Sequence, residues 1–138
     1  IELKDQSKTF YATHGVLERA TAEALVKYDG VVAVMSFNPH SIAHMSQFAP
    51  RISRGFATDS VGEFDSDFGV SNPLKLYESL GASFISHNVL DLPSDIIQKF
   101  KAKGDPVLCW TVKSEIQEKR ARMIADNITF ESYLPKFP

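Results

Sequence analysis

The first residues of the chain alternate between apolar and charged side chains. Ile1 and Leu3 alternate with Glu2 and Lys4, and this period of two is typical of a β-strand whose two faces differ. Glu2 and Lys4 therefore point to the same side of the strand. A carboxylate is a hard oxygen ligand that suits Mg²⁺ or Ca²⁺, and a nearby ammonium group can hold an anion. The pair has the chemistry to hold a divalent cation and an anion; the alternative is a pair of solvated side chains.

Aromatic and polar side chains stand at or near the ends of later apolar segments. Phe37 ends the apolar run 31–37, and Trp110 lies in the run 106–112. Either ring can form the apolar wall of a pocket, although an aromatic residue in a strand also commonly belongs to the core. We predict Phe37 and Trp110 as substrate-binding residues. Asn88, near the end of another apolar segment, is a further candidate as a hydrogen-bond donor.

The histidines and the single cysteine do not have the pattern of a metal or thiol site. His40 and His44 are four residues apart, a spacing at which a helix can present two zinc ligands. No glutamate lies between them in the manner of zinc proteases, and no clear third ligand follows. We predict that both lie on a solvated helix face and that His87 is structural. Cys109, in "PVLCWTV", is predicted to be a buried strand residue without a disulfide partner in this chain.

Strands and helices that would position these residues alternate along the whole chain. The segments with strand patterns are 1–4, 31–37, 55–58, 82–90, 106–112 and 127–131. The segments between them have helical periodicity, with Asn38, Ser94 and Ser114 as expected caps and with Gly81 and Gly104 as stops. The helix at 16–28 is expected to bury a stripe of Leu17, Ala20, Ala24 and Tyr28. The alternation predicts a parallel α/β fold in a single domain, residues 1–138.

Composition narrows the function classes. The 138 residues are 43% hydrophobic and 11% aromatic, as in globular proteins with a packed core. The net charge of −2 argues against a nucleic-acid partner, which needs a basic surface. No apolar run approaches the length of a membrane span. We expect a cytoplasmic protein.

Two architectures share this alternation, a doubly wound open sheet and a (β/α)8 barrel. A nucleotide-binding open sheet has a glycine-rich turn after a strand, and none of the strand ends here has one; they read KDQ, FNP, TDS, HNV, VKS and ESY. Polar and aromatic strand ends are typical of the rim of a barrel, where active sites lie. We predict a parallel (β/α)8 TIM barrel that is incomplete in this chain, with six of eight strands. The alternative is a flavodoxin-like sheet with the acidic segment 59–69 as its ligand loop.

Four motifs in order resemble the glycerophosphodiester phosphodiesterase family. They are IELK at 1–4, MSFNP at 35–39, GDPVLCWTV at 104–112 and ADNITFESYLP at 125–135. They are similar to the third, fourth, seventh and eighth strand regions of that family's barrel. The last motif departs from the family pattern at Asn127, Phe130 and Glu131, so we assign no role to Glu131.

The resemblance implies a fold, an activity and a set of roles. It implies that the chain is the C-terminal part of the barrel, strands three to eight. The intact protein would be a phosphoric diester hydrolase that releases an alcohol and glycerol 3-phosphate with the help of one Mg²⁺ or Ca²⁺ ion. Glu2 would be one of three acidic ligands of that ion, and Lys4 would hold the phosphodiester.

The same resemblance also implies what this chain lacks. The family's two catalytic histidines belong to a part that would precede Ile1, so we expect no catalytic residue in 1–138 and no activity of this segment alone. The absence of an initiator methionine agrees with this expectation. Two other interpretations stay open, a non-enzymatic α/β binding or regulatory module and a catalytically inactive relative. Unpaired edges at the first and sixth strands lead us to expect aggregation or a homo-oligomer of the segment.

Overall fold

The computed structural model describes residues 1–5, 13–59 and 73–136. Helices and strands alternate through these residues, as predicted. The helices are α1 (Val16–Leu25), α2 (Pro39–Phe48), α3 (Pro73–Ser79), α4 (Asp95–Lys103) and α5 (Glu115–Ala121), with the short 3-10 helix η1 (Val89–Asp91). The strands are β1 (Ala33–Ser36), β2 (Ser53–Thr58), β3 (Phe84–Asn88), β4 (Val107–Val112) and β5 (Asn127–Phe130). The acidic segment 59–69 lies outside the described residues except for Asp59.

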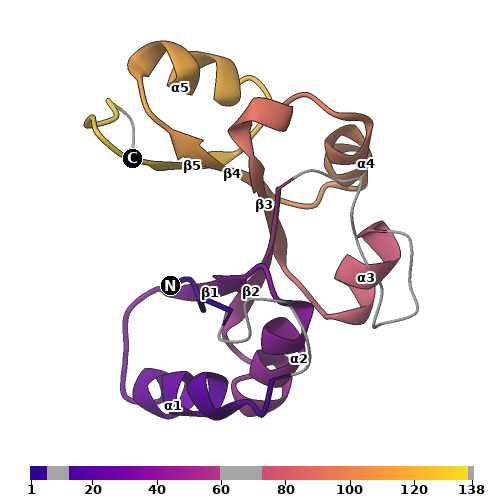
Figure 1. Ribbon diagram of the computed structural model, residues 1–138, viewed down its shortest axis with the longest axis vertical. Coiled ribbons are helices and arrows are strands. Elements are labelled where there is room, and N and C mark those ends of the chain that lie inside the picture. The colour runs from indigo at the N-terminus through magenta and orange to yellow at the C-terminus, as the bar shows by residue number, and fades with distance from the viewer. Residues whose placement is uncertain (6–12, 60–72, 137–138) are drawn as a thin grey trace.

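The five strands form one parallel sheet in the order β1-β2-β3-β4-β5. A doubly wound sheet reverses its strand order at a switch point, whereas here each strand pairs with the strand that follows it in the chain. Because parallel crossovers are right-handed, this order carries successive helices to the same side of the sheet. Figure 1 shows the strands along an arc with the helices α1 to α5 around its convex side. This is an incomplete (β/α)8 barrel, which confirms the predicted fold class and excludes the flavodoxin-like sheet.

The predicted strand at 1–4 is present only as a single bridge beside β1. Glu2 forms an isolated parallel bridge with Met35. The Leu3 amide donates to the Met35 carbonyl at 2.8 Å, and the Met35 amide donates to the Ile1 carbonyl at 2.8 Å. The segment therefore occupies the expected place next to β1. The described sheet nevertheless has five strands rather than the predicted six.

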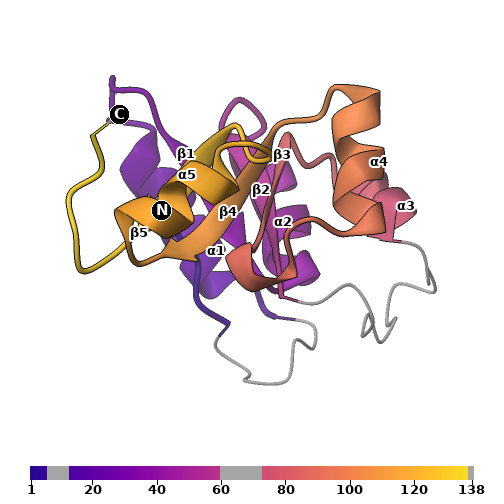
Figure 2. The same ribbon diagram turned by 90° about the horizontal axis from the view of Figure 1, so that it is seen from above.

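The hydrophobic core lies between the strands and the helices, in two clusters. The smaller cluster lies beneath α1 and α2 and consists of Leu3, Ala22, Leu25, Val34 and Met45. The larger cluster lies beneath α3, α4 and α5 and also includes Ile42 of α2. The helices α3 and α4 lie side by side (Figures 1 and 2). The rings of Tyr77 on α3 and Phe100 on α4 meet edge to face, with 4.9 Å between their centroids. Since alternate strand residues face the helices, the other residues of each strand face the concave side.

The buried face of α1 differs from the predicted one. Its buried residues are Glu18, Ala22 and Leu25, whereas Leu17 and Tyr28 are 36% and 55% exposed. Ser41 Oγ on α2 donates a hydrogen bond of 2.5 Å to Glu18 Oε1, and this partner offsets the cost of burying a carboxylate. The prediction of the stripe through Leu17 and Tyr28 was wrong because it ranked side chains by hydrophobicity alone.

Local signals at the helix ends are largely confirmed. Asn38 Oδ1 accepts a hydrogen bond from the His40 amide at 2.9 Å, and Ser114 Oγ accepts one from the Gln117 amide at 3.3 Å. Gly81 and Gly104 follow α3 and α4 with φ of 60° and 80°, a conformation that glycine adopts without strain. Ser94 occupies the cap position of α4 but makes no side-chain capping bond, which corrects that prediction.

Candidate functional site on the concave face

Glu2 and Lys4 point toward the concave side of the sheet. Leu3, between them, is 3% exposed and packs in the cluster beneath α1 and α2, so its two neighbours face the other way. Lys4 Nζ lies 2.7 Å from Glu2 Oε1, and the side chains are 74% and 25% exposed, respectively. The ion pair shows that the two residues share one side of the chain, as their spacing predicts.

Phe37 and Trp110 contact each other over the concave face, although two strands separate them in the sheet. Phe37 follows β1 and Trp110 lies in β4. In a flat sheet these strands would lie about 14 Å apart. Their ring centroids are 5.2 Å apart in an edge-to-face arrangement, and both side chains are partly exposed. The curl of the sheet thus brings together the two residues that the sequence predicts as substrate-binding.

A bulge in β4 sets the position of Trp110. Cys109 pairs with Ile128 and Val112 pairs with Phe130, so β4 has one more residue than β5 between these two pairs. Such a bulge changes the direction of the side chains within it. The indole Nε1 of Trp110 donates a hydrogen bond of 3.2 Å to the Ser86 carbonyl on β3, which fixes the plane of the ring against the neighbouring strand.

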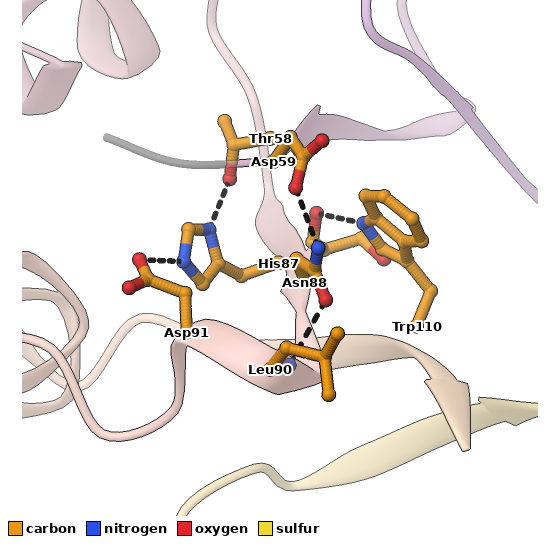
Figure 3. Close-up of polar contacts among 8 residues, drawn as sticks. Thr58, Asp59, His87, Asn88, Leu90, Asp91 and Trp110 are labelled. Carbon is orange, nitrogen blue, oxygen red and sulfur yellow. Dashed lines mark hydrogen bonds and ion pairs between the residues drawn. The ribbon is translucent and has the colours of Figure 1, made fainter. Parts of the chain in front are cut away.

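Asn88 holds the carboxylate of Asp59 beside Trp110 (Figure 3). Asp59 follows β2, Asn88 ends β3, and Asn88 pairs with Trp110 in the strand register. Asn88 Nδ2 donates a hydrogen bond of 2.5 Å to Asp59 Oδ1, and its Oδ1 accepts one of 2.9 Å from the Leu90 amide. Asn88 is therefore a donor to a protein carboxylate. Asp59 was predicted only as the first residue of the ligand loop of the alternative open sheet, and its signal for a barrel site was the polar strand end TDS.

His87 lies on the opposite side of β3 from Asn88, as Figure 3 shows. The imidazole is fully buried. Its Nδ1 is 2.6 Å from Thr58 Oγ1, and its Nε2 is 2.8 Å from Asp91 Oδ2. Both ring nitrogens thus have protein partners on the helix side of the sheet. This arrangement agrees with the predicted structural role of His87.

The two histidines of α2 do not lie on a solvated face, so that prediction was wrong. Both are partly buried. His44 Nε2 lies 3.0 Å from the Thr13 carbonyl oxygen, and its ring stacks on Phe48 with 5.6 Å between centroids. His44 thus packs against the segment before α1, which the periodicity of α2 alone could not show.

Glu2 does not form a complete metal site with the other described residues. Within residues 1–5, 13–59 and 73–136, no three His, Cys, Asp or Glu side chains come together in a way that could hold a metal ion. Ca²⁺ takes about six to eight oxygen ligands and Mg²⁺ about six, whereas one Glu2 oxygen already pairs with Lys4. Among the described residues, Glu2 can therefore supply one ligand of a cation site, and the remaining ligands would have to come from elsewhere.

Solved structures share this fold, whereas no protein-family model and no curated protein matches the sequence. A protein from Silicibacter pomeroyi DSS-3 assigned as a glycerophosphoryl diester phosphodiesterase superposes with a TM-score of 0.72 and 18% identity, over 94% of this chain and 45% of its own. A phosphodiesterase from Oleispira antarctica, solved in complex with the product sn-glycerol-3-phosphate, has a TM-score of 0.66 and 20% identity, over 83% and 46%. A glycerophosphodiester phosphodiesterase from Parabacteroides distasonis ATCC 8503 has a TM-score of 0.62 and 20% identity, over 94% and 51%.

The chain has the fold of part of a (β/α)8 barrel, and the solved proteins that share it are named as phosphodiesterases. It spans about half the length of these three proteins. Their names agree with the family that the four sequence motifs resemble, and the similarity extends over nearly the whole chain in two of the three cases. In the part of the chain that the structure describes, no helix combines the length and apolar character needed to cross a membrane.

Proposed function

We propose that residues 1–138 are the C-terminal portion of the barrel of a glycerophosphodiester phosphodiesterase. The intact protein would hydrolyse a glycerophosphodiester to an alcohol and glycerol 3-phosphate. The observation that carries this proposal is the placement of a charged pair and an aromatic pair on the same concave face, in a fold shared with phosphodiesterases. The glycerol 3-phosphate complex of the Oleispira antarctica protein supports a small phosphorylated ligand for this fold.

The concave residues have distinct roles in this proposal. The Lys4 ammonium, which is 74% exposed, binds the phosphodiester anion and stabilises the negative charge that grows on it in the transition state. Glu2 contributes one carboxylate ligand to a divalent cation, Mg²⁺ or Ca²⁺, whose other ligands come from residues outside this chain. When bound, the cation polarises the phosphoryl oxygens.

Phe37 and Trp110 form an apolar wall for the carbon atoms of the substrate. Their edge-to-face contact keeps both rings in place without blocking their partly exposed surfaces. No described residue on the concave face is assigned as the general acid or base. We therefore expect residues 1–138 alone to be inactive. The identity of the metal ion, Mg²⁺ or Ca²⁺, stays a prediction, as does a cytoplasmic location.

Substitution of Glu2 in the full-length protein that contains these residues tests the proposal. Glu2→Ala should lower metal-dependent release of glycerol 3-phosphate from glycerophosphocholine by about 100-fold or more, because a cation ligand is lost. Glu23→Ala removes the same type of side chain from the exposed face of α1 and should leave the rate unchanged. Release is measured with Mg²⁺, with Ca²⁺ and with a chelator.

Two results would count against the proposal in different ways. Wild-type rates in Glu2→Ala would remove the role of Glu2 in binding the cation. No release from any glycerophosphodiester by the wild-type protein would contradict the enzymatic function and favour a catalytically inactive relative.

A further inference from the structure

In the described residues, the backbone ladder beside β1 ends immediately before Lys4. Glu2 forms a single bridge with Met35, and the last bond of this bridge runs from the Leu3 amide to the Met35 carbonyl at 2.8 Å. Lys4 lies beyond this pairing. Its side chain is 74% exposed in the ion pair with Glu2, and an ion pair in solvent restrains a flexible side chain only weakly. The chain on either side of Lys4 therefore has to place the ammonium group.

A side chain of β1 holds the residue before Lys4, at the point where the ladder ends. In a parallel ladder that continued, the Leu3 carbonyl would accept its hydrogen bond from the Phe37 amide. Here Ser36 Oγ donates a hydrogen bond of 2.7 Å to that carbonyl. The Ser36 hydroxyl also accepts a bond of 3.1 Å from the Asn38 amide. The hydroxyl is thus bonded as donor and as acceptor, which fixes its direction toward Leu3.

Asn38 holds the residue after Lys4. Its Nδ2 donates to Asp5 Oδ1 at 2.9 Å, and its Oδ1 accepts from the His40 amide at the start of α2, also at 2.9 Å. Ser36 and Asn38 are both fully buried. Polar side chains are costly to bury and are seldom buried unless they are hydrogen-bonded. Two connected, buried polar side chains thus hold the chain on both sides of Lys4.

We propose that Ser36 and Asn38 are positioning residues for Lys4. Through Leu3 and Asp5 they set where the ammonium group lies on the concave face. The proposal rests on the function proposed above, in which Lys4 binds the phosphodiester, and it adds two residues to that function. Each side chain acts through a neighbour of Lys4 and touches no substrate. A displacement of about 1 Å in an active site can cost about 100-fold in rate, so the hold on this segment affects the reaction.

Substitution of Asn38 by aspartate separates positioning from helix capping. In Asn38→Asp the new carboxylate can still cap α2, but it cannot donate to Asp5 and it repels that carboxylate. In the full-length protein this variant should lower kcat/KM for glycerophosphocholine by about 10- to 100-fold. Ser114→Ala is the matched control, because it removes a cap whose bond is to Gln117 in its own helix, and it should leave kcat/KM unchanged. Wild-type kinetics in Asn38→Asp would overturn the proposal.

A double-mutant cycle tests whether Ser36 acts through Lys4. Ser36→Ala should lower kcat/KM about tenfold or more in the wild-type background. In a Lys4→Ala background it should lower kcat/KM less than about twofold, because residues that act through one group have non-additive effects. A general loss of structure would lower kcat/KM by the same factor in both backgrounds. Equal factors would therefore overturn the proposal.

Hydrogen exchange provides a readout that does not depend on activity. In Ser36→Ala and in Asn38→Asp, amide exchange in residues 1–5 of the full-length protein should become about tenfold faster or more, with a smaller change in β3 and β4. Ser114→Ala should match the wild-type protein in residues 1–5. If no glycerophosphodiester is hydrolysed, the proposed function fails, and the exchange rates still decide whether the two residues hold the segment. Unchanged exchange in residues 1–5, or an equal increase throughout the chain, would contradict that hold.

Discussion

At the scale of single residues, burial sets the chemistry of Cys109. Its side chain is fully buried in the larger core cluster. Burial raises the pKa of the thiol from 9.0 to about 11, and the nearby Arg122 charge lowers it by a smaller amount. Because the folded-state pKa lies above the unfolded value, the stabilising effect of the neutral thiol is present below pH 9 and is lost as pH rises through about 11.

We predict that Cys109 does not react with a thiol reagent at pH 8 while the protein is folded. The reactive species is the thiolate, and the core excludes both the thiolate and the reagent. In denaturant the residue should react at the rate of an ordinary cysteine. The reaction is followed by absorbance in the full-length protein, with Cys109→Val to identify the signal. Rapid reaction of Cys109 in the native protein would contradict its buried position.

Residue types and strand alternation were sufficient to predict four side chains that lie on the concave face. The period of two predicts that Glu2 and Lys4 share one side of a strand. The positions of Phe37 and Trp110 in apolar runs made them candidates for the wall of a pocket. Asp59 could not be found in this way, because its importance depends on which residue of β3 lies beside it. The strand register that sets this neighbour is a property of the assembled sheet.

At the scale of elements, the start of α2 depends on one side chain that has two roles. Asn38 is fully buried. Its Oδ1 accepts a hydrogen bond from the His40 amide, and its Nδ2 donates to Asp5 Oδ1, each at 2.9 Å. The residue thereby caps the helix and also ties it to the segment that carries Glu2 and Lys4.

We predict that Asn38→Ala lowers the free energy of unfolding of the full-length protein by about 1–2 kcal/mol, the usual cost of a lost cap. Ser94→Ala is the matched control at the start of α4. It should cost less than about 0.5 kcal/mol, since Ser94 makes no side-chain capping bond. Both values come from denaturant titration. Equal losses in the two variants would show that the Asn38 bonds do not contribute as the geometry implies.

Element types and order were predictable, but the buried face of α1 and the length of the first strand were not. A buried carboxylate at Glu18 becomes favourable only because Ser41, on another helix, donates to it. The pairing at Glu2 stops after one bridge, although the alternation of side chains is that of a strand. In both cases the outcome depends on a tertiary partner that local patterns do not contain.

At the scale of the whole molecule, the described sheet has an exposed edge at β5. In the described part of the chain, β5 pairs with β4 alone, and Phe130 is 43% exposed. A strand with unpaired amide and carbonyl groups is a template for pairing with another chain. In a complete barrel a further strand would cover this edge.

We predict that residues 1–138 expressed alone self-associate and do not form a monomer of 15.4 kDa. The full-length protein should be free of this association, because a closed barrel has no edge. Sedimentation velocity and thermal melting compare the two. A soluble monomer of the segment with a sharp melting transition would contradict the proposal that it is part of a larger barrel.

The sequential strand order also bears on how the chain is made. In the described sheet each strand from β1 to β4 bonds to the strand that comes next in the polypeptide, so each of these pairs can form as soon as the second strand of the pair is synthesised. As the chain leaves the ribosome, every new strand–helix unit can dock on the unit completed just before it, and its apolar surface is covered within a short time. Growth by addition at one end limits the exposure of hydrophobic surface during translation.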